Sequence, residues 1–115
     1  MLQSRAMGSP PDYAQLADAC LKSVERWVTR LDDDDLDCTY GDGLLVLEFE
    51  DGVRFVLNRQ SAAGQMWLAA GARAWHYNWD DGRKTWVDDR DGHDLYVRIA
   101  TVVGEKLGRP VAFEG

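Results

Sequence analysis

The sequence has few of the residues that form covalent cross-links, metal centres and catalytic sites. Its 115 residues include two cysteines, two histidines and three prolines. Two thiols cannot build a disulfide framework, and Cys20 and Cys38 are too far apart for a CxxC motif, so one bridge is the most that they could form. We expect both thiols to be reduced and structural, in a cytoplasmic protein.

Long apolar runs are also missing. No run approaches the roughly 18 apolar residues of a transmembrane helix, and the first residues lack the apolar stretch of a secretory signal. Residues 1–11 contain Ser, Gly, two prolines and no acid, which predicts a disordered leader. The remaining residues, 12–115, are enough for one domain with its own hydrophobic core.

Motifs of the common catalytic classes do not occur either. The sequence contains no HExxH, GxSxG, GxxxxGK or GxGxxG, which would indicate a zinc protease, a serine hydrolase or a nucleotide-binding loop. We expect His76 on the surface of a strand and His93 in the first turn of a helix. The sequence therefore predicts a protein that is not an enzyme.

Basic residues are scarce in one half of the chain. The net charge is −7, and nine of the twenty acids lie between Leu31 and Asp51, where no Lys or Arg occurs. Nucleic acids and anionic membranes both require basic surfaces, so we expect neither as a partner. The asymmetry instead predicts a surface for cations or for a cationic protein.

Hydrophobic periodicity predicts an α+β fold. Apolar residues recur every three or four positions in residues 12–31 and 93–107, which indicates two amphipathic helices. Between them, six segments have the composition of strands and are joined by short Gly-containing turns, which favours an antiparallel sheet. The strands are expected at residues 36–40, 44–50, 53–58, 65–69, 75–79 and 84–87. The predicted fold is a two-layer sandwich with both helices on one face of the sheet.

Alternation within the strands assigns side chains to the two faces of this sheet. If Met66 and Leu68 face the helices, Trp67 is left on the open face. In the strand 75–79 the three aromatic residues share a face, and we expect all three in the core. His76 and Asn78 should then point outward.

The acidic run at residues 32–37 is the first candidate site. Five of its six residues are aspartates, but it is not an EF-hand, because Cys38 stands where the loop needs glycine and Leu44 where it needs glutamate. What remains is a shallow, oxygen-only cluster that suits hard cations such as Fe²⁺, Fe³⁺, Mn²⁺, Ca²⁺ and Mg²⁺. The alternative is a solvated loop that keeps the protein soluble.

A second candidate combines polar side chains with one tryptophan. It is either a polar loop beside a partly buried indole or a binding surface for another protein, where such compositions form hot spots. Its residues are Asn58, Arg59, Gln60, Gln65 and Trp67.

These segments resemble the frataxin family in its bacterial form, over roughly residues 12–113. The most specific feature is the spacing from Asn58-Arg59-Gln60 to Gln65-Met66-Trp67-Leu68. The similarity continues in register through Trp75-His76-Tyr77, Trp86 and Asp89-Arg90-Asp91-Gly92.

The resemblance implies the frataxin sandwich and a non-catalytic role in iron–sulfur cluster assembly. It implies a monomer that binds iron weakly and docks on a cysteine desulfurase and its scaffold protein, with the second candidate as the partner-binding site. Arg26, Thr29 and Arg30 stand where bacterial members usually carry acids, which shifts the expected iron site toward residues 32–37. The metal ligands carried over are Asp18, Glu25, Asp32, Asp33, Asp34, Asp35 and Asp37.

Two other functions stay open at this point. A ferroxidase would oxidise Fe²⁺ and would need a fixed, desolvated iron site, which the sequence does not show. A divalent-cation buffer would bind the same ions without any protein partner.

Overall fold

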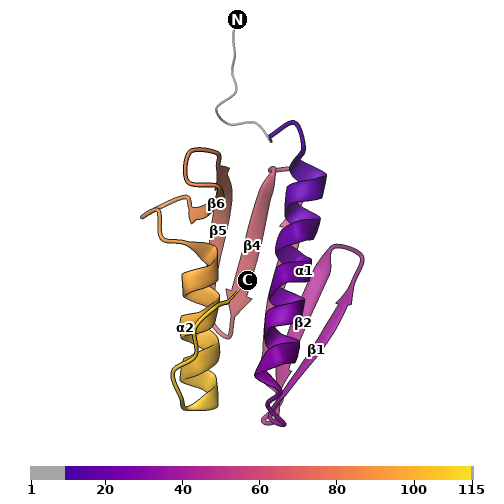
Figure 1. The fold of residues 1–115 in the computed structure, drawn as a ribbon, viewed down its shortest axis with the longest axis vertical. Helices are drawn as coiled ribbons and strands as arrows, with labels where there is room; N and C mark the ends of the chain where they lie inside the picture. The colour runs from indigo at the N-terminus through magenta and orange to yellow at the C-terminus, as the bar shows by residue number, and fades with distance from the viewer. Residues whose placement is uncertain (1–9, 115) are drawn as a thin grey trace, which may run out of the picture.

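The structure, a computed structural model, describes residues 10–114 (Figure 1). The predicted leader therefore lies almost wholly outside the described residues. Eight elements follow in chain order: α1 (Tyr13–Leu31), β1 (Leu36–Gly41), β2 (Leu44–Phe49), β3 (Arg54–Gln60), β4 (Gln65–Ala70), β5 (Arg73–Asp80), β6 (Thr85–Asp88) and α2 (Leu95–Leu107).

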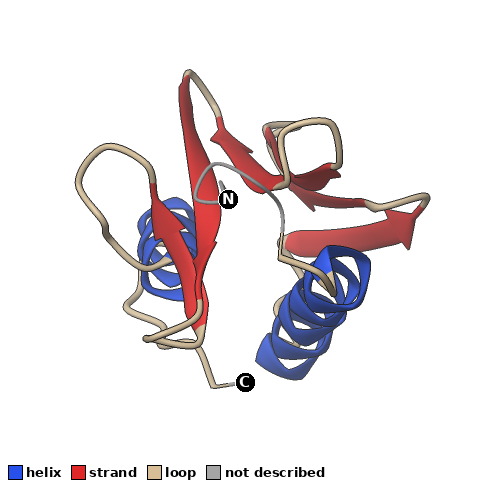
Figure 2. Ribbon diagram, turned by 90° about the horizontal axis from the view of Figure 1, so that it is seen from above, coloured by secondary structure: helices blue, strands red, loops and turns tan. Residues whose placement is uncertain are grey.

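The six strands form one antiparallel sheet in sequential order, β1 to β6. Both helices lie in front of this sheet in Figure 1, and α1 packs on β1, β2 and β3 while α2 packs on β6. The view from above separates the two helices (Figure 2). The predicted two-layer α+β sandwich is confirmed. No helix in residues 10–114 has the length and apolar character to span a membrane.

The core lies between the helices and one face of the sheet. Alternate side chains of the strands point into it, as predicted. Met66 and Leu68 are buried, whereas Trp67 between them is on the other face. The expectation for β5 was partly wrong. Tyr77 is fully buried, but Trp75 and Trp79 flank it and are only partly buried.

Most element boundaries differ from the sequence prediction by one or two residues. The helix α2 begins at Leu95, because the Asp94 carboxylate accepts hydrogen bonds from Tyr96 N and Val97 N and so ends the preceding turn. His93 therefore lies just before the helix and not in its first turn. The strand β3 continues through Gln60, so Arg59 and Gln60 belong to the sheet and not to the loop after it. At α1, Asp12 occupies the N-cap position but its side chain makes no capping bond.

The C-terminal segment fills the space between the two helices. Trp27 Nε1 donates a hydrogen bond to Ala112 O at 2.8 Å, and the Phe113 ring packs on Trp27 and Tyr96. Where this segment crosses α2, it passes close to Gly104. A Cβ atom at that position would lie 2.8 Å from Arg109 O and 3.4 Å from Val111, so only glycine fits there.

We predict that Gly104→Ala destabilises the protein. In an unobstructed helix the change would stabilise by about 1 kcal/mol, but the overlap with the backbone oxygen should reverse the sign and cost roughly 1–3 kcal/mol. The free energy of unfolding in urea measures this. The exposed Thr101→Ala in the same helix is the control and should stay within about 0.5 kcal/mol. A more stable Gly104→Ala would contradict the packing of the C-terminal segment.

Candidate functional site

The acidic loop, residues 32–35, joins α1 to β1 in a defined conformation. Asp32 has φ 49° and its N–H donates to Thr29 O, which ends the helix. Asp33 Oδ1 accepts a hydrogen bond from Asp35 N at 2.9 Å, and Asp33 Oδ2 accepts one from Arg109 Nη2 at 3.1 Å. These two bonds, the backbone N–H first, hold the pKa of Asp33 below its usual value. The loop is thus tied to the C-terminal segment through Asp33.

The backbone divides the predicted acidic cluster between two hollows. One hollow of about 330 Å³ is lined by Asp32, Asp33, Asp34 and Asp37, together with Val28, Thr29, Leu36 and Cys38. Asp35 instead lines a second hollow of about 160 Å³ on the other side, with Phe49, Glu50, Asp51, Lys106 and Leu107. Lys106 binds Asp51 there. The first hollow therefore keeps four of the five aspartates and no basic side chain in its wall.

The predicted ligands on α1 have different surroundings. Asp18 Oδ1 lies 2.7 Å from Arg59 Nη1, so this acid is already paired with a basic side chain of β3. Glu25 faces Cys38 of β1, the strand that follows the acidic loop. Burial, together with the charge of Glu25, raises the pKa of the Cys38 thiol to about 11.

The acidic loop does not form a closed metal cage. In the part of the chain that the structure describes, three potential ligand atoms come within 4.8 Å of one another only at Asp88, Asp91 and His93. Sequence reasoning missed this group, although the Asp-x-x-Asp-x-His spacing was visible. On the acidic loop the carboxylates are separate, which suits weak binding of hydrated hard cations.

The second candidate divides between the two faces of the sheet. Trp67 lies opposite Asn58 on one side and His76 on the other, all on the open face. Arg59 pairs with the buried Met66, so its side chain is on the helix face, where it binds Asp18. The sequence analysis grouped Arg59 with Trp67 and its neighbours on the open face. In the structure the Arg59 side chain lies on the opposite face of the sheet.

The Trp67 indole is fixed on the open face by its neighbours. Its ring stacks on His76 with centroids 4.3 Å apart, and Nε1 donates to Gln65 Oε1 at 2.9 Å. Gln65 Nε2 in turn donates to Asn78 Oδ1 at 3.2 Å and to Asp89 Oδ2 at 3.4 Å. The half-buried indole and its amide partners make a preorganised flat surface, which is the kind that protein interfaces use.

Comparison with known proteins agrees with the fold and with these segments. A family model described as a frataxin-like domain matches residues 7–109. The iron–sulfur cluster assembly protein CyaY of Ralstonia nicotianae is 39% identical over 98 residues, which cover 83% of this chain and 85% of the relative. The protein of the same name from Burkholderia mallei is 34% identical over 107 residues, with 91% and 97% covered. The chain belongs to the frataxin family.

Solved structures give the same result for the architecture. Frataxin from Psychromonas ingrahamii superimposes with a TM-score of 0.82 at 28% identity and covers 94% of this chain and 100% of its own. The trimeric frataxin of Saccharomyces cerevisiae, solved in complex with ferrous iron, gives a TM-score of 0.64 at 23% identity, with 89% and 90% covered. At that identity the yeast protein supports the fold alone.

We predict that the thiol lining the acidic hollow is unreactive. Both cysteines are free, and with a pKa of about 11 Cys38 should hold about a hundredfold less thiolate at pH 8 than an unfolded cysteine. Burial raises the pKa of Cys20 to about 12. A disulfide reagent should therefore label both thiols quickly in denaturant and slowly in the folded protein, with Cys38→Ser assigning the two rates. Rapid labelling of folded Cys38 would contradict the burial described above.

Proposed function

We propose that the protein takes part in iron–sulfur cluster assembly as a non-catalytic, iron-binding regulator or iron donor. It would hold iron weakly at the acidic loop and dock on a cysteine desulfurase and its scaffold protein, as a monomer in the bacterial cytoplasm. Membership of the frataxin family and the names of the CyaY relatives support the pathway. The iron-binding part of this proposal rests on one observation, the open hollow lined by Asp32, Asp34 and Asp37.

The chemistry of that hollow fits iron as a passing cargo and not as a fixed centre. Its charged side chains are all carboxylates, which suit Fe²⁺ and other hard divalent cations. Asp34 and Asp37 are exposed, so each can bind an ion that keeps most of its water. A ferroxidase would need iron held in a fixed, desolvated site, and this loop offers no such enclosure.

The proposed docking uses two surfaces with different physics. The acidic loop would attract a basic partner over a distance, which mainly sets the rate of encounter and its salt dependence. The open face, centred on Trp67 with Asn58, Gln60 and Gln65, would supply short-range contact. Arg59 would act indirectly in this scheme, because it binds Asp18 under the helix.

We predict that Fe²⁺ binds at the acidic loop with a dissociation constant near 10⁻⁴–10⁻³ M, as loose oxygen sites do. In an anaerobic titration followed by NMR, paramagnetic broadening should centre on residues 32–37 and extend to Glu25. The double variant Asp34→Asn, Asp37→Asn should weaken Fe²⁺ binding, because both carboxylates line the hollow and are exposed.

The control for this titration is Asp42→Asn, an exposed acid in the turn between β1 and β2, at the opposite end of β1 from the loop. Asn tolerates the φ of 55° found there, and the variant should bind Fe²⁺ as before. Broadening at the histidines with residues 32–37 untouched would overturn the proposed iron site.

We predict that the two docking surfaces respond differently to substitution. Asp34→Lys with Asp37→Lys should slow association with the desulfurase and flatten its salt dependence, because the steering charge is reversed. Trp67→Ala should weaken the complex by about 2 kcal/mol or more and leave most of the fold stability intact.

Surface plasmon resonance with the purified desulfurase at several salt concentrations measures both effects. The control is Val97→Ala, which truncates an apolar side chain that is 64% exposed on α2 and should not change binding. If Trp67→Ala unfolds the protein and binding per folded molecule is unchanged, the open face is not the docking surface.

A further inference from the structure

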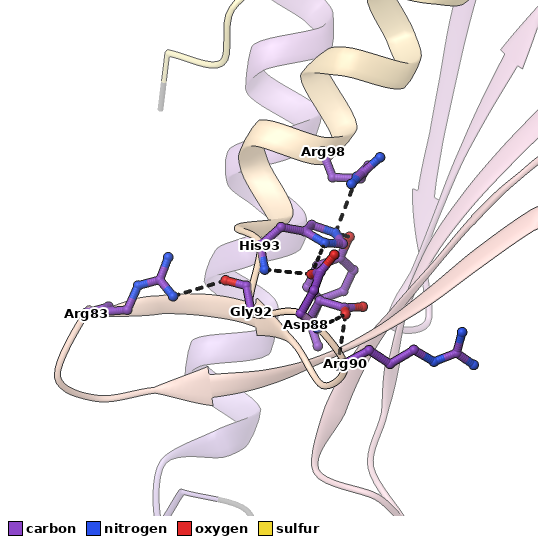
Figure 3. Close-up of polar contacts among 8 residues, drawn as sticks. Arg83, Asp88, Arg90, Gly92, His93 and Arg98 are labelled. Carbon is purple, nitrogen blue, oxygen red and sulfur yellow. Dashed lines mark hydrogen bonds and ion pairs between the residues drawn. The ribbon is translucent and has the colours of Figure 1, made fainter.

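The turn between β6 and α2 gathers three side chains that the proposed function does not use (Figure 3). Asp88 N donates to His93 O at 2.8 Å and Gly92 N donates to Asp88 O at 3.0 Å, which closes the turn. Gly92 has φ +77°, a conformation that other residues rarely adopt. The closed turn brings the side chains of Asp88, Asp91 and His93 together.

Asp88 is a buried acid that lacks a complete set of partners. It is 5% exposed and is the one charged side chain found buried among residues 10–114. Its Oδ2 accepts hydrogen bonds from Arg90 N and Asp91 N, both at 2.9 Å. No described residue donates to Oδ1, whereas a buried carboxylate normally has partners for both oxygens. A buried anion in this state calls for a nearby positive charge.

His93 is held in one orientation by contacts at both of its ring nitrogens. Its Nε2 accepts a hydrogen bond from Arg98 Nε at 3.3 Å and lies 2.7 Å from Tyr77 Oη, and its ring packs edge-on against Tyr77. Its Nδ1 lies 2.6 Å from Asp91 Oδ1, on the side of the carboxylates. These contacts fix the direction of Nδ1, and an ion that binds there would replace the proton of its hydrogen bond to Asp91, which is released to solvent.

The neighbouring basic groups leave the carboxylate side of the ring free. Arg98 is on the Nε2 side, where its guanidinium also lies 4.9 Å from the Trp75 ring centroid. Arg83 Nη1 donates to Gly92 O. The side chain of Arg90 points away from the cluster in Figure 3. The charge facing Nδ1 therefore comes from the two carboxylates.

We propose that Asp88, Asp91 and His93 bind a divalent transition-metal ion of borderline hardness, Zn²⁺ in particular. Their ligand atoms lie within 4.8 Å of one another, and ligands of one tetrahedral Zn²⁺ at 2.0–2.2 Å lie about 3.3–3.6 Å apart. The side chains need to close by up to about 1.5 Å, which the largely exposed Asp91 permits. One imidazole and two carboxylates suit Zn²⁺ and Co²⁺, whereas Ca²⁺ and Mg²⁺ prefer oxygen alone.

An ion at this position would join the start of α2 to the end of β6, because the ligands come from the turn between them. Binding to the folded state alone would stabilise the protein, and the stabilisation would grow with the logarithm of the ion concentration once this exceeds the dissociation constant. The site is also independent of the acidic loop, since it shares none of its residues. The two proposals can therefore fail separately.

Co²⁺ is the probe, because it takes the same ligands as Zn²⁺ and is paramagnetic. The Co²⁺ titration is followed by NMR in the wild-type protein and in the double variant Asp34→Asn, Asp37→Asn. In both, signals of Tyr77, residues 88–94 and the His93 ring should shift or broaden first, and the melting temperature should rise. His93→Gln and Asp91→Asn should each weaken binding at least about tenfold, since loss of an outer partner alone costs 10–100-fold.

The matched control is His76→Gln, which removes the other histidine and should leave Co²⁺ binding unchanged. Co²⁺ effects confined to His76 or to residues 32–37 would overturn the proposal. So would equal affinity in wild type, His93→Gln and Asp91→Asn, or equal effects of Mg²⁺ and Co²⁺ on the His93 ring. If His93→Gln does not fold, Asp91→Asn decides, because its carboxylate is exposed and its amide retains the shape.

Discussion

The burial of two helices on one face of a six-stranded sheet is the constraint on which the rest of this structure depends. Strand side chains alternate between the two faces of the sheet. Covering one face with helices therefore determines which strand residues are buried and which lie on the open face. Asn58 and Arg59 are neighbours in sequence, yet one faces the open surface beside Trp67 and the other reaches under α1 to Asp18. The same division buries Met66 and leaves the indole of Trp67 available.

Local patterns in the sequence predicted the layers, the hairpins and the faces of β4, because each depends on residues close together in the chain. The boundaries were less predictable. His93 and Asp94 could both begin a helix, and only the bonds from Tyr96 N and Val97 N to Asp94 select the cap. Residues 58–60 have a polar composition typical of a loop, but pairing with β4 keeps them in the sheet.

The candidate sites were predictable only where their residues are contiguous. The acidic run was visible in the sequence, but the separation of Asp35 from the other aspartates was not. The bond between Asp33 and Arg109, 76 residues away, could not be predicted either. The pairing of Asp18 with Arg59 likewise depends on how α1 crosses the sheet. In the turn after β6, the spacing of Asp88, Asp91 and His93 was visible in the sequence. The burial of Asp88, which distinguishes this group from other acidic turns, follows from the tertiary fold and was not predictable.

The two groups of acids differ in the kind of cation that each can hold. On the acidic loop, exposed and separate carboxylates can bind a hydrated hard ion weakly and release it quickly. The delivery of iron would require such release. In the turn before α2, a buried carboxylate and an oriented imidazole favour an ion that loses its water and stays, and such an ion would stabilise the fold. Cation affinity and cation exchange are opposing demands on one site. The two proposed sites lie apart in the chain, one in the acid-rich half and one in the half that holds most of the arginines, and this separation would let one small domain meet both demands.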